Sequence, residues 1–140
     1  MSTQNELYSA FELDEDTLRN KVKFIKATRT GIPGKTIQTM IKLLENRDLI
    51  TKVLGTHSRN LNRVYHKPKM KRDTSEEILD LIRLYGEAAR IFGDLSLAKD
   101  WMQTPVTALS GETPESLCDT FEGREWVAQV LRKIEYGEFV

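Results

Sequence analysis

The stretch "TSEEILDLIRLYGEAARIFG", residues 74–93, decides the fold class of this chain. Its apolar side chains recur with the helical period and would share one face: Ile78, Leu81, Ile82, Tyr85, Ala88, Ala89 and Phe92. Thr74 and Glu77 have the spacing of a capping box, and Gly93 is a residue type that commonly ends a helix. The stretch therefore predicts a long amphipathic helix that buries one face.

Shorter segments with the same period flank this helix and predict an all-α protein. They lie at residues 18–25, 37–44, 49–54, 61–65, 95–103 and 121–136. In the first segment we expect a buried stripe of Leu18, Val22 and Ile25. In the last we expect one of Trp126, Val127, Val130, Leu131 and Ile134. No segment is predicted to be a strand, and no apolar run approaches the roughly 18 residues of a membrane span.

Charge is distributed unevenly along the chain. Residues 17–72 carry 15 Lys and Arg against two acidic residues, a net charge of +13. Residues 73–140 carry 14 acidic residues against six basic ones, a net charge of −8, and residues 1–16 carry five acidic residues and no basic one. These blocks predict an acidic N-terminal extension, for which flexibility is one expectation, then a basic domain and an acidic domain with different partners. An acidic N-terminus is unlike a signal peptide, so a cytoplasmic protein is expected.

The basic block contains a candidate helix-turn-helix at residues 49–66, "LITKVLGTHSRNLNRVYH". A short apolar-faced helix reaches Gly55, and a second helix follows with Leu61, Val64 and Tyr65 directed inward. The opposite face and the residue after it supply the candidate DNA-binding residues: Ser58, Arg59, Asn60, Asn62, Arg63 and Lys67. Arg and Asn can bind base edges bidentately, and lysines can bind phosphates. The alternative is a solvated basic face on an ordinary helical bundle.

From Phe92 onward the chain contains five features in a fixed order: "FGD" at 92–94, Trp101 before "TP", "ALSGETP" at 108–114, "DTFEG" at 119–123 and "IEYG" at 134–137. This region resembles the toxin-binding domain of the Xre/MbcA/ParS antitoxins. The resemblance extends to the preceding basic block, where that family carries its DNA-binding domain. The chain departs from the family at Ser110, where a second glycine is frequent, in the candidate recognition helix, and at Tyr136, where His is frequent.

The resemblance implies an Xre-like helix-turn-helix domain over residues 17–72 and a small helical toxin-binding domain over residues 73–140. It implies an antitoxin of a type II toxin–antitoxin system, a binding protein without catalytic residues. Such an antitoxin would block the active site of a cognate RES-type, NAD-consuming toxin or a related ADP-ribosylating toxin. It would also bind operator DNA to regulate its own operon. We expect a homodimer, because paired half-sites suit two-fold symmetry, and no cofactor, metal or membrane partner.

The end of the chain supplies the candidate toxin-binding residues: Arg132, Tyr136, Gly137, Glu138, Phe139 and Val140. In this interpretation "GEFV" inserts into the active site of the toxin; the alternative is that Phe139 packs on the protein's own core. Two other functions remain open for the whole chain. One is a stand-alone transcriptional regulator whose acidic half senses a ligand or mediates self-assembly, and the other is a toxin-binding module without DNA binding.

Four residues within the acidic block, residues 73–140, are expected to have structural roles. We expect Cys118 to be a small buried residue, because nothing basic adjoins it in sequence. Gly111 and Gly123 are expected to adopt positive φ angles in a loop and at a helix entry. Glu77 is expected to be a first-turn acid that complements a helix dipole.

Overall fold

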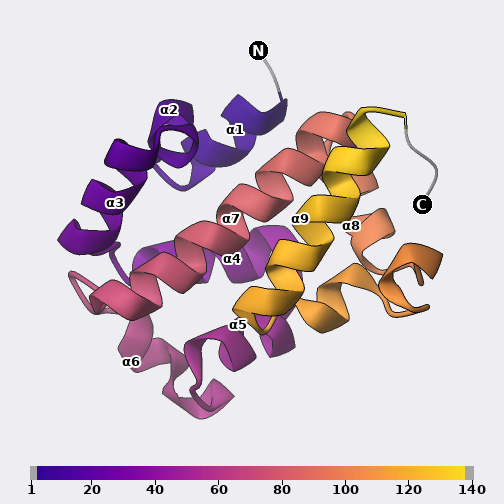
Figure 1. Cartoon of the computed structure of the whole chain (residues 1–140). Coiled ribbons are helices and arrows are strands. Elements are labelled where there is room, and N and C mark those ends of the chain that lie inside the picture. The colour runs from indigo at the N-terminus through magenta and orange to yellow at the C-terminus, as the bar shows by residue number, and fades with distance from the viewer. Residues whose placement is uncertain (1–2, 138–140) are drawn as a thin grey trace.

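The computed structural model describes residues 3–137, and helix α7 (Arg72–Phe92) runs through its middle (Figure 1). Ten of the 21 residues of α7 are buried, so this helix forms the centre of the core. The long helix predicted from the sequence is confirmed, but it begins at Arg72. Its N-cap is Lys71, which makes no side-chain capping bond, so Thr74 does not cap the helix.

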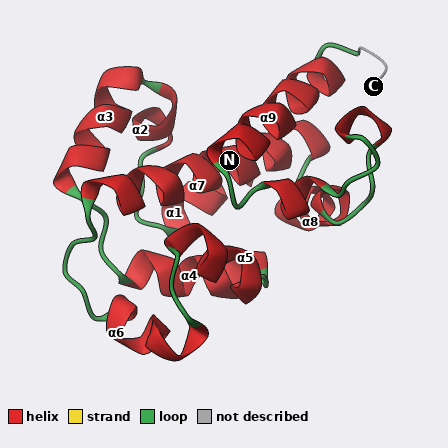
Figure 2. Cartoon of the chain, turned by 60° about the horizontal axis from the view of Figure 1, so that its bottom comes forward, coloured by secondary structure: helices red, strands yellow, loops and turns green. Residues whose placement is uncertain are grey.

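The other elements pack around α7, and all described residues outside loops are helical, which confirms the all-α class (Figure 2). In chain order they are α1 (Thr3–Ala10), α2 (Glu15–Arg19), α3 (Lys21–Thr30), α4 (Lys35–Leu44), α5 (Arg47–Leu54), η1 (Ser58–Asn60), α6 (Leu61–Tyr65), α8 (Leu95–Met102), η2 (Thr107–Leu109), η3 (Pro114–Leu117) and α9 (Phe121–Glu135). Over residues 3–137 no helix is both long and apolar enough to cross a bilayer.

The acidic N-terminal segment is packed against α7. Leu7, Tyr8 and Phe11 are buried, and Tyr8 lies directly over Gly86 in the middle of α7. A Cβ atom at Gly86 would lie 2.2 Å from the hydroxyl oxygen of Tyr8. Glycine is therefore needed at this position, because it lets the tyrosine approach the α7 backbone. Leu7, Tyr8 and Phe11 thus belong to the hydrophobic core.

The predicted stripe of Leu18, Val22 and Ile25 is wrong, because the chain leaves the helical conformation at Asn20. The side chain of Asn20 accepts a hydrogen bond from Lys23 N and starts a new helix, α3. This break changes the helical phase, so α3 buries a different face, and Val22 and Ile25 are 75% and 47% exposed. The predicted stripe is based on residue spacing and requires residues 18–25 to form one continuous helix.

Residues 66–71, which contain Pro68, connect α6 to α7 and are held against the loop between α3 and α4. Gly34 N donates to the carbonyl of Lys67 (2.8 Å), and Met70 N donates to the carbonyl of Ile32 (2.7 Å). The Ser75 hydroxyl accepts from Ile32 N at 3.1 Å. Hydrogen bonds therefore hold this connecting segment in place. One continuous hydrophobic core extends through the basic and the acidic parts of the chain.

In the C-terminal part, α8 and α9 pack on α7; Gly111 lies in the loop between α8 and α9, and Gly123 lies in the first turn of α9. Gly111 has the expected positive φ of 82°, and Ser110 before it is also left-handed, with φ 59°. Gly123 does not have a positive φ; a Cβ atom there would lie 1.7 Å from the carbonyl oxygen of Leu117. Gly123 is therefore required by a close backbone approach. Trp126 is also not buried as expected, with 37% of it exposed.

Candidate functional site

The candidate DNA-binding residues lie on η1, α6 and the residue that follows. Leu61 and Val64 are buried and Tyr65 is half-buried, as the sequence predicts, so α6 turns one face to the core. The candidate residues Ser58, Arg59, Asn62, Arg63 and Lys67 are exposed, whereas Asn60 is half-buried. The structure therefore brings the polar side chains together on one outer face of a short helical segment.

The start of this segment is capped by a histidine. His57 is the N-cap of η1, because its Nδ1 atom accepts a hydrogen bond from Arg59 N at 3.2 Å. The Ser58 hydroxyl instead accepts from Arg47 at the start of α5, at 3.3 Å. Ser58 is thus exposed but already bonded to the neighbouring helix.

Close backbone packing fixes α6 relative to α4. A Cβ atom at Gly34, just before α4, would lie 1.8 Å from the carbonyl oxygen of Val64 in α6. Only glycine permits this approach. Because the two helix ends touch, the face carrying Asn62 and Arg63 has a defined orientation in the fold.

The cations around this face have no ion-pair partner among the described residues. Within residues 3–137, no salt bridge involves Arg59, Arg63, Lys67, Lys69, Lys71 or Arg72. All six residues are exposed. An exposed cation without an internal partner can exchange its counterion for a phosphate, which is the main source of non-specific affinity for DNA. The surface therefore has the chemistry of a polyanion-binding site.

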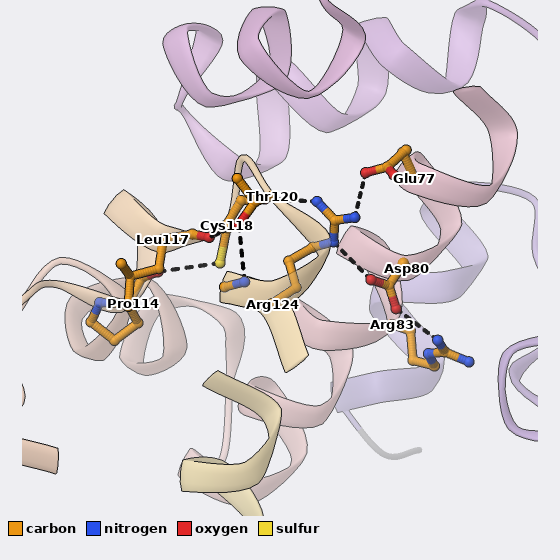
Figure 3. Close-up of polar contacts among 9 residues, drawn as sticks. Glu77, Asp80, Arg83, Pro114, Leu117, Cys118, Thr120 and Arg124 are labelled. Atoms are coloured by element: carbon orange, nitrogen blue, oxygen red, sulfur yellow. Dashed lines mark hydrogen bonds and ion pairs between the residues drawn. The ribbon is translucent and has the colours of Figure 1, made fainter. Parts of the chain in front are cut away.

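A second candidate site lies between α7 and α9, where Arg124 is almost completely buried, with 2% exposure (Figure 3). Its Nε atom donates to Asp80 at 2.7 Å, and one terminal nitrogen donates to the Cys118 carbonyl at 2.9 Å. The other terminal nitrogen is paired with Glu77. Asp80 also accepts from Arg83, at 2.7 Å. The guanidinium thus ties the start of α9 to α7 and to the turn after η3.

Sequence reasoning missed this cluster and assigned Glu77 to a helix dipole. That assignment is wrong, because α7 begins at Arg72 and the Glu77 carboxylate bonds Arg124 instead. The available signal was the pair of acids at 77 and 80, three residues apart on one helical face. Cys118 is buried as expected. Burial raises the pKa of its thiol to about 12, and the thiol donates to the Pro114 carbonyl at 3.3 Å.

The other end of α9 is also tied to α7. Arg90 donates to Glu135 at 2.8 Å and to Glu87 at 2.7 Å. These bonds raise the pKa of Arg90 above its ordinary value, and the bond from Arg90 lowers the pKa of Glu135. Charge-assisted bonds at both ends therefore hold α9 in one position.

A groove of about 280 Å³ lies between the two helices. Leu84, Ile91, Ala128 and Leu131 supply its apolar lining, and charged side chains of both signs supply the rest, among them Arg132 and Glu135. Tyr136 lies at the same groove and is largely exposed. An apolar depression with charged edges is suited to a side chain of a protein partner.

The candidate toxin-binding residues are only partly placed by the structure. Arg132 and Tyr136 come together at the groove, and Gly137 ends the helix with a φ of 74°. Glu138, Phe139 and Val140 lie outside the described residues. Figure 1 shows α6 and the C-terminal end of α9 near opposite ends of α7. Over residues 3–137, no three metal-binding side chains gather into a cluster.

The C-terminal part of the chain is similar to known proteins. Residues 87–137 match the family model described as the antitoxin Xre/MbcA/ParS C-terminal toxin-binding domain. A protein named Antitoxin Xre from Yersinia enterocolitica is 33% identical over 92 residues, 64% of this chain and 62% of that protein. Another of the same name, from Photorhabdus laumondii, is 33% identical over 90 residues, 63% of this chain and 61% of that protein. The chain thus spans less than two thirds of either relative's length, and the resemblance seen in the sequence is confirmed.

Proposed function

We propose that this protein is the antitoxin of a toxin–antitoxin pair, because residues 87–137 match the model of the antitoxin Xre/MbcA/ParS C-terminal toxin-binding domain. It is a cytoplasmic binding protein and not an enzyme. The observation that carries this proposal is that the matched region contains most of the α7–α9 groove and its clamped helix. The unpaired cations of η1 and α6 lie outside that region, which leaves them available for a different partner.

The partner of the C-terminal region is a RES-type, NAD-consuming toxin or a related ADP-ribosylating toxin. A toxin of this kind must bind a pyrophosphate, so its cleft is expected to be basic. Residues 73–140 have a net charge of −8, which complements such a cleft. Arg132, Tyr136 and Gly137 would contact the entrance, and Glu138, Phe139 and Val140 would extend into the cleft.

The partner of the N-terminal region is operator DNA, through which the antitoxin represses its own operon. Arg59, Asn62 and Arg63 are exposed on one face and carry the side chains that bind base edges. The lysines at 67, 69 and 71 would bind phosphates. A homodimer follows from this proposal, because a single helix-turn-helix contacts few base pairs and two-fold symmetry matches paired half-sites.

The proposal is tested with the toxin expected in the adjacent reading frame, a RES-domain protein. Purified antitoxin should prevent this protein from consuming NAD, and deletion of residues 138–140 should leave binding detectable but weaken inhibition. The deletion should leave the melting temperature unchanged, because the last buried residue of α9 is Leu131. A lower melting temperature would instead indicate that Phe139 packs on the protein's own core.

Two results would redirect the proposal. If the neighbouring toxin is absent or remains active, while the protein binds its own promoter fragment, the stand-alone regulator is the better description. If the toxin is inhibited but no promoter fragment binds, the protein is a toxin-binding module without DNA binding.

A further inference from the structure

The turn between α4 and α5, residues 43–46, is called the elbow here. Glu45 is left-handed, with φ 54°, and ends α4. Asn46 starts α5, because its Oδ1 atom accepts a hydrogen bond from Leu49 N at 3.1 Å. The elbow therefore sets the angle between α4 and α5.

Two side chains from the part of the chain matched to toxin-binding domains reach this elbow. Lys99 on α8 donates to the carbonyl of Leu43 at 3.1 Å, and its ammonium lies 3.2 Å from Glu45 Oε1. Glu115 on η3 accepts from the Asn46 Nδ2 atom at 3.1 Å. Only 19% of the Lys99 side chain is exposed, so its bond to the Leu43 carbonyl is shielded from water. The exposed Glu45 carboxylate adds little.

The contact from Glu115 fixes the orientation of the capping amide. The oxygen of the Asn46 side chain caps α5 while its nitrogen is held by the Glu115 carboxylate. Both the oxygen and the nitrogen of the Asn46 side-chain amide are therefore hydrogen-bonded. The bond from Leu49 N identifies which of the two atoms is the oxygen, because a backbone N–H needs an acceptor. Removing Glu115 would free the amide to rotate and would weaken the cap.

Direct contacts connect the elbow to the proposed DNA-binding face on η1 and α6. α5 leads through Gly55 to η1 and α6, while α4 touches α6 through the close approach of Gly34 to Val64. A change in the angle between α4 and α5 must therefore move α6 or break one of these contacts. Packed helices offer few intermediate positions.

We propose that Lys99 and Glu115 are positioning residues for DNA recognition, and that they couple the toxin-binding region to the operator-binding face. This inference rests on the proposed function. A protein that binds over α8 or η3 would disturb the elbow and change the affinity for operator DNA. By thermodynamic reciprocity, operator DNA would change the affinity of that protein by the same factor.

The two side chains can be removed without unfolding the protein. We expect this because Leu49 and Ile50 on α5 are buried and α5 packs directly on α7. Lys99→Met keeps the aliphatic stem and removes the charge, and Glu115→Ala removes the acceptor. Glu115→Gln is the conservative variant, because its amide oxygen can still accept from Asn46. Lys133→Met and Glu112→Ala are matched controls at exposed positions of the same region.

Two measurements on the full-length chain test the inference. The first is hydrogen exchange of the Leu49 amide in the free protein, which should be about fivefold faster in Glu115→Ala and unchanged in Glu115→Gln. The second is the affinity for a DNA fragment carrying the protein's own promoter. The Lys99→Met, Glu115→Ala double variant should bind roughly fivefold more weakly or worse, with the melting temperature nearly unchanged. The control variants should match the unmodified protein.

The outcomes separate this inference from the proposed function. Failure of the unmodified protein to bind the fragment overturns both the DNA-binding proposal and this inference. If the unmodified protein binds, but the double variant binds equally well, only the positioning role is overturned. Unchanged exchange at Leu49 in Glu115→Ala also overturns it, whatever the result with DNA. Arg63→Ala should lose DNA affinity without changing exchange at Leu49, which distinguishes a contact residue from a positioning residue.

Discussion

Arg63 and Arg124 carry the same chemical group, a guanidinium, in two different environments. Arg63 is exposed on α6 and makes no salt bridge within residues 3–137. Arg124 is buried between α7 and α9 and bonds Glu77, Asp80 and the Cys118 carbonyl. The first arrangement leaves a cation available to a partner, and the second uses the cation to fix a helix. A count of charges along the chain treats the two alike, so net charge identifies a function only where the cations have no internal partners.

The largest expected effect comes from Arg124→Ala. It would remove a buried side chain and its bond to the Cys118 carbonyl, and it would leave Glu77 unpaired and Asp80 with Arg83 alone. We expect a cost of about 3 kcal/mol in the free energy of unfolding. Arg63→Ala, the matched control, should change stability by less than about 0.5 kcal/mol. Urea unfolding of both variants measures the difference.

Cys118 supplies a local probe of the same variant. Its thiol is buried with a pKa raised to about 12, so it should react very slowly with a thiol reagent in the native protein. Loss of the Arg124 bond to the Cys118 carbonyl should make the reaction faster in Arg124→Ala. Equal stability and equal thiol reactivity in Arg124→Ala and Arg63→Ala would contradict the view that Arg124 holds α9 in place while Arg63 has no structural role.

The next effect concerns binding rather than folding. Arg63→Ala should weaken specific operator binding by about 1–3 kcal/mol and relax the preference at one base position. Neutralising one lysine among residues 67–71 should instead weaken binding to all sequences and reduce the salt slope by roughly one unit. Anisotropy titrations over a range of salt concentrations separate the two. If both substitutions leave binding unchanged, the DNA-binding face is wrongly assigned.

A smaller effect is expected from Ser110→Gly. Ser110 has the left-handed φ of 59°, which costs a non-glycine residue about 1 kcal/mol. The substitution should therefore stabilise the protein by up to about 1 kcal/mol in thermal or urea unfolding. Operator affinity should not change, because the loop is remote from α6 in Figure 1. Destabilisation would show that the serine hydroxyl has a role that outweighs the backbone strain.

The smallest effect is a pH dependence at the far end of α9. The hydrogen bond from Arg90 lowers the pKa of Glu135 below its ordinary value of 4.5. A lowered folded-state pKa adds stability above the unfolded-state pKa, and this contribution is lost as the pH falls through the folded-state value. Melting temperatures of Glu135→Gln and of the unmodified protein should differ slightly at pH 7 and converge in acid. A difference that grows in acid would contradict this assignment.

The sequence by itself determined the helical class, the order of most helices and the resemblance of the C-terminal region to a family of toxin-binding domains. These features follow from local patterns, because the helical period, Gly and Pro positions and short motifs are encoded by neighbours in the chain. The inward orientation of Leu61 and Val64 was predictable for the same reason. The stripe of Leu18, Val22 and Ile25 failed where the capping side chain of Asn20 restarted the helix.

Only the tertiary structure decided the contacts between distant residues. Arg124 bonds acids more than 40 positions away, Tyr8 covers Gly86, and Glu115 holds Asn46. Each contact depends on how helices lie across one another, and an acidic residue looks the same in sequence whether it faces water or an arginine. The same holds for Gly123, where the need for glycine comes from the approach of the Leu117 carbonyl and not from its own backbone angles. Local propensity specifies the elements, and packing specifies which side chains meet.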